Sequence, residues 1–174
     1  MIRKLELNEF DTIYELLKQC FPGDEYRTYD QQRALLDNPY YQIYVLSDEN
    51  KQIKAFMAIF EFEQIAHIEH FAVNPLYRNG GLGSKMLNDV VALLNKRVCL
   101  EVELPDNEMA SRRIAFYKRN NFYLNEYPYM QPPMSLGKKA IPLFIMTSQS
   151  KVSKEEFDKI KTLLYTKVYN QDRT

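Results

Sequence analysis

The chain has 174 residues, of which 45% are hydrophobic and 26% are charged, so it is long enough for one domain with a buried core and has the composition of an ordinary globular protein. Lys and Arg together number 23, and so do Asp and Glu, which leaves a formal net charge of zero. A neutral chain lacks the basic field of proteins that bind nucleic acid without regard to sequence, and neutrality argues equally against an electrostatic membrane anchor.

Residues 2–38 are predicted to form one strand and two helices. Residues 2–7 alternate apolar and polar side chains, as a half-buried strand does. Asn8 can then cap a helix over residues 9–20, which has acidic side chains in its first turn. Residues 28–38 predict a second, shorter helix.

Residues 40–73 are predicted to form two or three antiparallel strands. Residues 48–50, Asp-Glu-Asn, supply the first turn, and a weaker break falls near residues 63–64. A glycine-rich loop follows and leads into a helix over residues 82–96, whose apolar side chains recur at helical spacing.

The rest of the chain predicts further strands and helices without a repeat, a low-complexity tract or an interdomain linker. The predicted elements are an apolar strand over residues 97–104, a helix over 108–122, a strand over 141–148, and an amphipathic helix over about 153–169 that opens with a capping box from Ser153 to Glu156. Their order indicates an α/β fold with a mixed sheet, in a single domain over residues 1–174.

The few cysteines and histidines argue against a disulfide framework and against a typical zinc site. Cys20 and Cys99 form no CxxC motif, and His67 and His70 are the only histidines. We therefore expect no metal. The N-terminus lacks the apolar stretch of a signal peptide, and no run approaches the ~20 apolar residues of a membrane-spanning helix. A reduced, cytoplasmic setting is expected.

The loop "YRNGGLGSKM" at residues 77–86 fails two common nucleotide-binding patterns. A P-loop needs G-x-x-x-x-G-K-[ST], but Gly80 and Gly83 are only three positions apart, and a G-x-G-x-x-G fingerprint fails at Met86. A third pattern, Arg/Gln-x-x-Gly-x-Gly/Ala, is satisfied from Arg78 to Gly83. Main-chain N–H groups at a helix start carry a partial positive charge that suits a diphosphate. A plain turn that needs a positive φ is the alternative.

The loop and its neighbours together resemble the GCN5-related N-acetyltransferase (GNAT) family. "HIEHFAVNPLYRNGGLGSKML" is similar to that family's strand, loop and helix, and "LEV" at residues 100–102 to its next strand. "RRIAFYKRNNF" resembles the helix that ends in Tyr, four residues and Phe, and "YPYMQPPM" with "IPLFIMT" resembles a closing hairpin. The resemblance covers residues 40–148 well, the first 40 loosely, and the last 25 not at all.

This resemblance implies a mixed, mostly antiparallel sheet flanked by helices, with two central parallel strands that splay apart. It also implies acetyl-CoA as cosubstrate, with its pantetheine arm against the "FAV" strand and its diphosphate on the glycine loop. The residues implied for the cosubstrate are Phe71, Ala72, Val73, Arg78, Asn79, Gly80, Gly81, Leu82, Gly83, Ser84 and Tyr117. Two positions depart from the family: Ala110 stands where Asn is common, and Asn121 where Gly is usual, although Asn tolerates the left-handed conformation.

The resemblance also implies which side chains move protons. Tyr117 is the candidate general acid for the leaving thiolate, the alternative being a core tyrosine. Glu101 and Glu69 are equal candidates for the base that deprotonates the amine, and His67 follows them. Alternation along a strand places Glu69 on one face with His67 and Phe71. Each carboxylate could instead be a solvated edge residue or part of an ion pair.

The acceptor is expected to be a primary amine of a small molecule or a peptide, in a pocket framed by the loop between the first two helices and by the closing hairpin. Four tyrosines are candidates for that pocket: Tyr26, Tyr29, Tyr127 and Tyr129. Cys99 lies in an apolar strand, so burial and direct attack in a ternary complex are favoured over an acetyl-cysteine. A module that only senses acyl-CoA is the alternative. We expect a monomer or a homodimer, and the last helix either covers a sheet edge or forms an interface.

Overall fold

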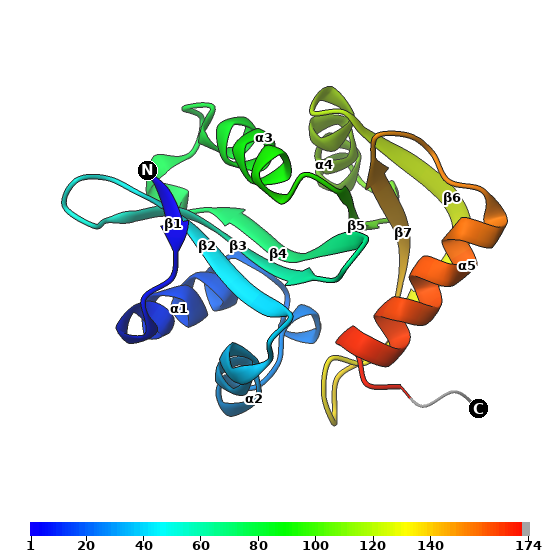
Figure 1. Cartoon of the computed structure of the whole chain (residues 1–174), viewed down its shortest axis with the longest axis horizontal. Coiled ribbons are helices and arrows are strands. Elements are labelled where there is room, and N and C mark those ends of the chain that lie inside the picture. The colour runs from blue at the N-terminus through cyan, green and yellow to red at the C-terminus, as the bar shows by residue number, and fades with distance from the viewer. Residues whose placement is uncertain (172–174) are drawn as a thin grey trace. The chain divides into compact units, whose positions relative to one another are not determined.

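The computed structural model describes residues 1–171. The chain divides into two compact units, with the boundary between Val98 and Cys99, and each is described by itself. Figure 1 labels the elements of both. Within the described residues, no helix is both long enough and apolar enough to cross a membrane.

The first unit contains an antiparallel sheet of consecutive strands. Its strands are β1 (Ile2–Lys4), β2 (Tyr41–Ser47), β3 (Ile53–Glu61) and β4 (Ile65–Val73), each paired antiparallel with the next. The predicted run over residues 40–73 therefore resolves into three strands. In the turn between β2 and β3, the Asp48 carboxylate accepts hydrogen bonds from the N–H groups of Asn50 and Gln52, at 2.9 and 3.0 Å.

Three α-helices flank this sheet: α1 (Phe10–Cys20), α2 (Tyr29–Ala34) and α3 (Leu82–Leu94). Figure 1 shows α3 on one side of strands β2–β4 and the two N-terminal helices on the other. Helix α3 buries its predicted apolar stripe and α1 also buries its apolar side, as Val90 and Ile13 illustrate with no exposed surface. The core therefore lies on both faces of the sheet.

The predicted cap at Asn8 is wrong. The chain enters α1 through a 3-10 turn over Leu7–Glu9, and Asn8 lies inside that turn. Glu9 stabilises the turn before the helix instead. Its carboxylate accepts a hydrogen bond from the Glu6 N–H at 2.9 Å and forms an ion pair with Arg3 at 2.7 Å. The first strand accordingly ends at Lys4 rather than at residue 7.

The second unit is built on a three-stranded antiparallel sheet. β5 (Arg97–Glu103) pairs with β7 (Ile141–Ser148), which pairs in turn with β6 (Phe122–Gln131). Helix α4 (Glu108–Arg119) precedes β6, and α5 (Lys154–Leu163) follows β7 and continues into a π turn over Leu164–Val168.

Local signals place the helices of this unit. The predicted capping box of α5 is confirmed, since Ser153 and Glu156 exchange hydrogen bonds of 2.9 and 3.2 Å. Asn121, between α4 and β6, has a φ of 66°, as its substitution for glycine predicts. Helix α5 packs on β6 because the Phe157 ring contacts Tyr127 and Tyr129.

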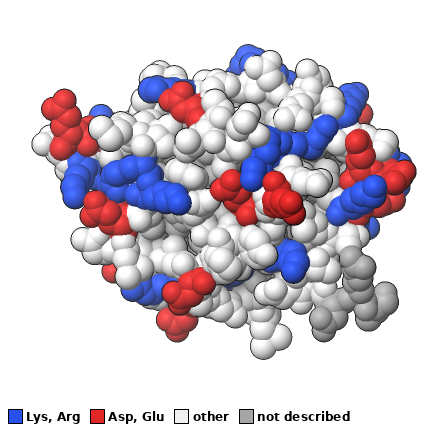
Figure 2. Space-filling view, in the orientation of Figure 1, with Lys and Arg blue, Asp and Glu red and all other residues white. Residues whose placement is uncertain are grey.

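The predicted fold class, α/β with mostly antiparallel strands and flanking helices, is confirmed. The single domain over residues 1–174 stays a prediction. On the face drawn in Figure 2, basic and acidic side chains are interspersed and neither sign forms a continuous field.

Candidate functional site

The glycine loop leaves β4 through a short 3-10 turn over Pro75–Tyr77. The Asn74 side chain caps this turn by accepting a hydrogen bond from the Leu76 N–H at 3.1 Å. The next residues are exposed to solvent: Arg78, Asn79, Gly80 and Gly81. Asn79 and Gly81 have φ values of 69° and 74°, in the left-handed region that asparagine and glycine adopt at the least cost.

Helix α3 begins directly after this turn, so its first N–H groups face out of the helix end. The first hydrogen bond of the helix joins the Lys85 N–H to the Gly81 carbonyl at 3.1 Å. The N–H groups of Leu82 and Gly83 precede that bond and have no acceptor within the helix. In the described part of the chain, a Cβ on Gly81 would meet no atom within 4 Å. An anion therefore has access to these amides.

Arg78 folds back on the base of the same loop. Its Nε donates to the Val73 carbonyl at 3.3 Å, and a terminal nitrogen lies 3.6 Å from Cys20 Sγ. The other residues predicted to contact the cosubstrate in this unit are half-buried at the end of β4 and the start of α3: Phe71, Ala72, Val73, Leu82, Gly83 and Ser84. These residues flank the exposed residues 78–81 along the chain.

A bulge at Glu69 interrupts the predicted side-chain alternation along β4. His70 pairs with Ala58 and Ile68 pairs with Ile59, so Glu69 is an extra residue in the strand. The predicted alternation of His67, Glu69 and Phe71 on one face is therefore wrong, because a bulge interrupts the side-chain period.

Glu69 forms a buried ion pair with Arg27, the residue just before the Thr28 cap of α2. Arg27 Nη1 lies 2.7 Å from Glu69 Oε1, and the two side chains are 8% and 1% exposed. Burial by itself would raise the pKa of Glu69, but the charge and hydrogen bond of Arg27, together with smaller contributions from His70 and His67, outweigh it, so the pKa is lowered. Glu69 is therefore an ionised carboxylate whose charge is already balanced.

His70 completes what we call the Arg27–Glu69–His70 cluster. Its Nε2 lies 2.6 Å from the Glu25 carbonyl; a carbonyl only accepts, so Nε2 carries the hydrogen. Burial lowers the pKa of His70, which leaves the imidazole neutral at pH 7. The cluster fastens the segment from Glu25 to Arg27 to β4. His67, the third candidate base, is fully buried opposite Phe60.

Tyr117 lies in the second unit, near the end of α4, and is 8% exposed. Its ring makes edge contacts with Phe116 and with Phe122 at the start of β6. Burial raises the pKa of Tyr117 to about 12. The phenol therefore keeps its proton at neutral pH.

Glu101 of β5 is held by two phenols of the same unit. The Tyr129 hydroxyl donates to Oε2 at 2.6 Å, and the Tyr169 hydroxyl donates to Oε1. Burial, reinforced by the charge of Glu101, raises the pKa of Tyr129, so this hydroxyl stays protonated. Sequence reasoning missed Tyr169 because the family resemblance ends at residue 148, and a tyrosine near the end of an amphipathic helix carries no signal of its own.

The four tyrosines predicted for the acceptor pocket all take part in intramolecular contacts. Tyr29 donates to Asp11 at 2.5 Å, and Tyr26 packs edge-on against Tyr14. Tyr127 donates to the Val152 carbonyl at 3.2 Å, and Tyr129 binds Glu101. Their role toward an acceptor stays a prediction.

The structure thus groups the candidates within each unit. The first unit holds the glycine loop together with Glu69 and His67, and the second holds Tyr117 and the carboxylate of Glu101. Cys99 is buried, 1% exposed. Within residues 1–171, no three His, Cys, Asp or Glu side chains are grouped so that they could hold a metal ion.

Comparison with known proteins points to one family. Residues 10–122, more than half of the chain, match the model of the acetyltransferase (GNAT) family. A proposed GNAT-family acetyltransferase from Bacteroides thetaiotaomicron has a solved structure that is 31% identical, with a TM-score of 0.91 over 99% of both chains. The comparison with curated proteins gives no match.

Structures of spermidine N-acetyltransferase from Vibrio cholerae are more distant. One variant is 16% identical with a TM-score of 0.63, over 84% of this chain and 91% of the other. A dodecameric form is 14% identical with a TM-score of 0.63, over 90% and 95%. At this identity the likeness concerns the fold.

Proposed function

Because the chain belongs to the acetyltransferase (GNAT) family, we propose that it transfers an acetyl group from acetyl-CoA to a primary amine of a small molecule or a peptide. The observation that carries this proposal is the exposed loop before α3, with its left-handed Asn79 and Gly81 and the open N–H groups of Leu82 and Gly83. The family uses acetyl-CoA as cosubstrate, and a helix start of this kind binds the diphosphate of such a carrier.

Glu101 is our candidate for the base. The ionised carboxylate of Glu69 is already neutralised by Arg27 and is only 1% exposed, so it is poorly placed to take a proton from an incoming amine. Glu101 is only half-buried. Each of its oxygens accepts one phenolic hydrogen bond.

The proposed reaction is direct attack in a ternary complex. The amine nitrogen gives a proton to Glu101 and forms a bond to the thioester carbonyl carbon, and collapse of the adduct breaks the carbon–sulfur bond. Tyr117 donates a hydrogen bond to the departing sulfur. Because its pKa of about 12 lies well above the ~8.5 of a thiol, full proton transfer is uphill. Solvent therefore supplies the final proton to the thiolate.

The acceptor class remains open among cationic amines, amino acids and peptide ends. The distant structural neighbours that act on spermidine favour including polyamines among the first candidates. The predicted acceptor tyrosines, the monomeric or homodimeric state and the cytoplasmic setting all stay predictions. The mass in solution tests the oligomeric state.

A sensing module that binds acyl-CoA without turnover is the second candidate. It is favoured by Ala110, which replaces the polar residue common in the family. Ala110 is 2% exposed, and its N–H donates a hydrogen bond to Asn107 Oδ1 at 2.9 Å. A thiol-release assay with acetyl-CoA and a panel of amines separates the two functions. Thiol release that depends on an amine supports the enzyme, whereas saturable binding without release supports the sensor.

Replacing Glu101 by Gln tests the base. We expect kcat to fall roughly 100-fold or more, which is the lower end of the effect of general base catalysis, with acetyl-CoA affinity retained. A variant that keeps wild-type turnover would remove Glu101 from the mechanism.

A further inference from the structure

We propose that Tyr129 and Tyr169 are positioning residues that hold the Glu101 carboxylate in place for acetyl transfer. Tyr169 comes from the C-terminal turn, beyond the residues that the family model matches, so this proposal makes the C-terminal segment a working part of the active site. It rests on the proposed function, in which Glu101 takes the proton of the amine.

The geometry fixes the carboxylate through both of its oxygens. Tyr129 binds Oε2 at 2.6 Å and Tyr169 binds Oε1. One hydrogen bond would leave the carboxylate free to rotate about that contact, whereas two donors on different oxygens define both its direction and its plane. Hydrogen bonds to an ionised acceptor are also stronger than bonds between neutral groups.

The two phenols are themselves held firmly. Tyr129 is 4% exposed and Tyr169 is 7% exposed, so neither ring is free to turn away into solvent. The Tyr129 ring packs against Phe157 of α5 and Tyr165 of the π turn. The Tyr165 hydroxyl donates to the Met130 carbonyl, which joins the turn to β6 beside Tyr129.

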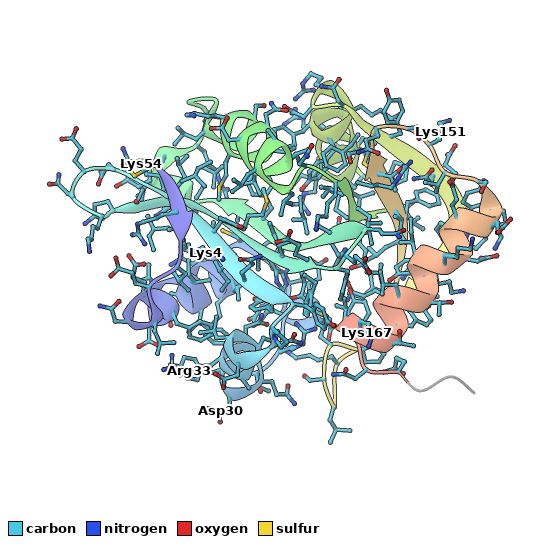
Figure 3. All side chains as sticks on the ribbon, viewed as in Figure 1. Lys4, Asp30, Arg33, Lys54, Lys151 and Lys167 are labelled. Atoms are coloured by element: carbon cyan, nitrogen blue, oxygen red, sulfur yellow. The ribbon has the colours of Figure 1, made fainter. Side chains whose placement is uncertain are left out.

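The π turn explains how Tyr169 reaches Glu101. The Tyr169 N–H bonds to the Leu164 carbonyl at 3.0 Å, five residues back instead of four. One extra residue in a helical turn rotates every later side chain by roughly 100° compared with a continuous α-helix. This turn, marked by Lys167 in Figure 3, therefore sets the direction of Tyr169. A π turn inside a helix is often found at a functional position.

The arrangement restrains the Glu101 side chain before the reaction begins. A glutamate side chain loses several rotamers when it is fixed, and that entropy is otherwise lost in the transition state. Here the two phenols fix it before the amine arrives.

The test compares Tyr169→Phe and Tyr129→Phe with the wild-type protein and with Tyr123→Phe. Tyr123 lies on the same strand as Tyr129 and is 41% exposed, so it controls for the loss of a phenol from β6. We expect kcat to fall about tenfold in each of the first two variants, while KM for acetyl-CoA changes by less than about twofold, because a displaced catalytic group slows the chemical step. Tyr123→Phe should keep wild-type kcat.

The same variants are then made in a Glu101→Gln background. If Tyr169 acts through Glu101, Tyr169→Phe lowers kcat in the wild type but changes it less than about twofold once Glu101 is Gln. Equal fold-losses in both backgrounds, or an unchanged kcat for Tyr169→Phe in the wild type, would overturn the positioning role.

A stability cycle separates failure of this proposal from failure of the proposed function. Thermal unfolding of Glu101→Gln, Tyr169→Phe and the double variant measures their coupling without any activity. A wild-type protein that binds no acetyl-CoA and acetylates no amine overturns the proposed function. In that case the stability cycle still tests whether Tyr169 and Glu101 interact. If the decreases in melting temperature of the two single variants sum to that of the double variant, the two side chains are not coupled, and the positioning role of Tyr169 is overturned even in an active enzyme.

Discussion

The ion pair between Arg27 and Glu69 predicts a large loss of stability when Glu69 is replaced by Gln. The two groups are 2.7 Å apart, and their side chains are 8% and 1% exposed. Removal of one partner of a buried pair leaves the other charge without compensation and costs about 3–5 kcal/mol. For a chain of this size each kcal/mol lowers the melting temperature by about 2–4 °C, so the expected decrease is roughly 6–20 °C.

Two matched variants isolate the cause. Glu15→Gln breaks an exposed pair with Lys18, in which the side chains are 61% and 44% exposed, and should cost less than about 1 kcal/mol. The double variant Arg27→Met with Glu69→Gln removes both charges of the buried pair. It should recover most of the stability lost in Glu69→Gln, because no buried charge is then left alone.

Thermal unfolding at pH 7, followed by circular dichroism, measures these differences, and thiol release well below the melting temperature measures kcat. Because we assign Glu69 to the attachment of residues 25–27 and Glu101 to catalysis, kcat of folded Glu69→Gln should stay within about threefold of wild type. A melting temperature like that of Glu15→Gln would refute the buried ion pair. A roughly 100-fold loss of kcat at unchanged stability would identify Glu69 as the base.

Three further predictions concern the second unit. Tyr117→Phe should lower kcat about tenfold or more while acetyl-CoA affinity is kept; unchanged turnover would exclude Tyr117 from the chemistry. The pKa of Tyr117 is about 12 in the fold and near ~10 when unfolded. Burial of the protonated phenol therefore contributes fully to the free energy of unfolding below pH ~10, and this contribution is lost between pH ~10 and ~12. Over that range the free energy of unfolding, measured by urea titration, should fall by up to ~3 kcal/mol more in wild type than in Tyr117→Phe. The same pH dependence in both proteins would contradict the burial of the phenol. Cys99→Ala should keep kcat within about twofold, because Cys99 is buried in an apolar strand, and an acetyl-cysteine adduct in the mass spectrum would contradict direct attack.

Local sequence signals predict most of the fold. The capping box at Ser153 and the left-handed asparagine at position 121 occur as predicted, because both depend on a few neighbouring residues. The strand over residues 141–148 also has its predicted limits. The glycine loop was recognised from spacing, and its exposure and left-handed residues agree with a loop that an anion can approach.

The features that the sequence did not predict depend on contacts between residues of different elements. The bulge at Glu69 arises from the pairing of β4 with β3, and the helix entry at Phe10 from the contacts of Glu9 with Arg3 and Glu6. Tyr169 reaches Glu101 across 68 residues of sequence. Such pairings are decided by the tertiary fold, so side-chain periodicity alone could not supply them.

The titration of acetyl-CoA into the wild type and into Gly81→Asn tests the central claim most directly. Asparagine accepts a positive φ, as Asn79 does in the same loop, and the added side chain has open space, so the fold should be kept. If the diphosphate approaches the amides of this loop, wild type binds saturably, and the variant binds at least about tenfold more weakly while its melting temperature falls only slightly. No binding by the wild type, or equal binding by both, would contradict the account.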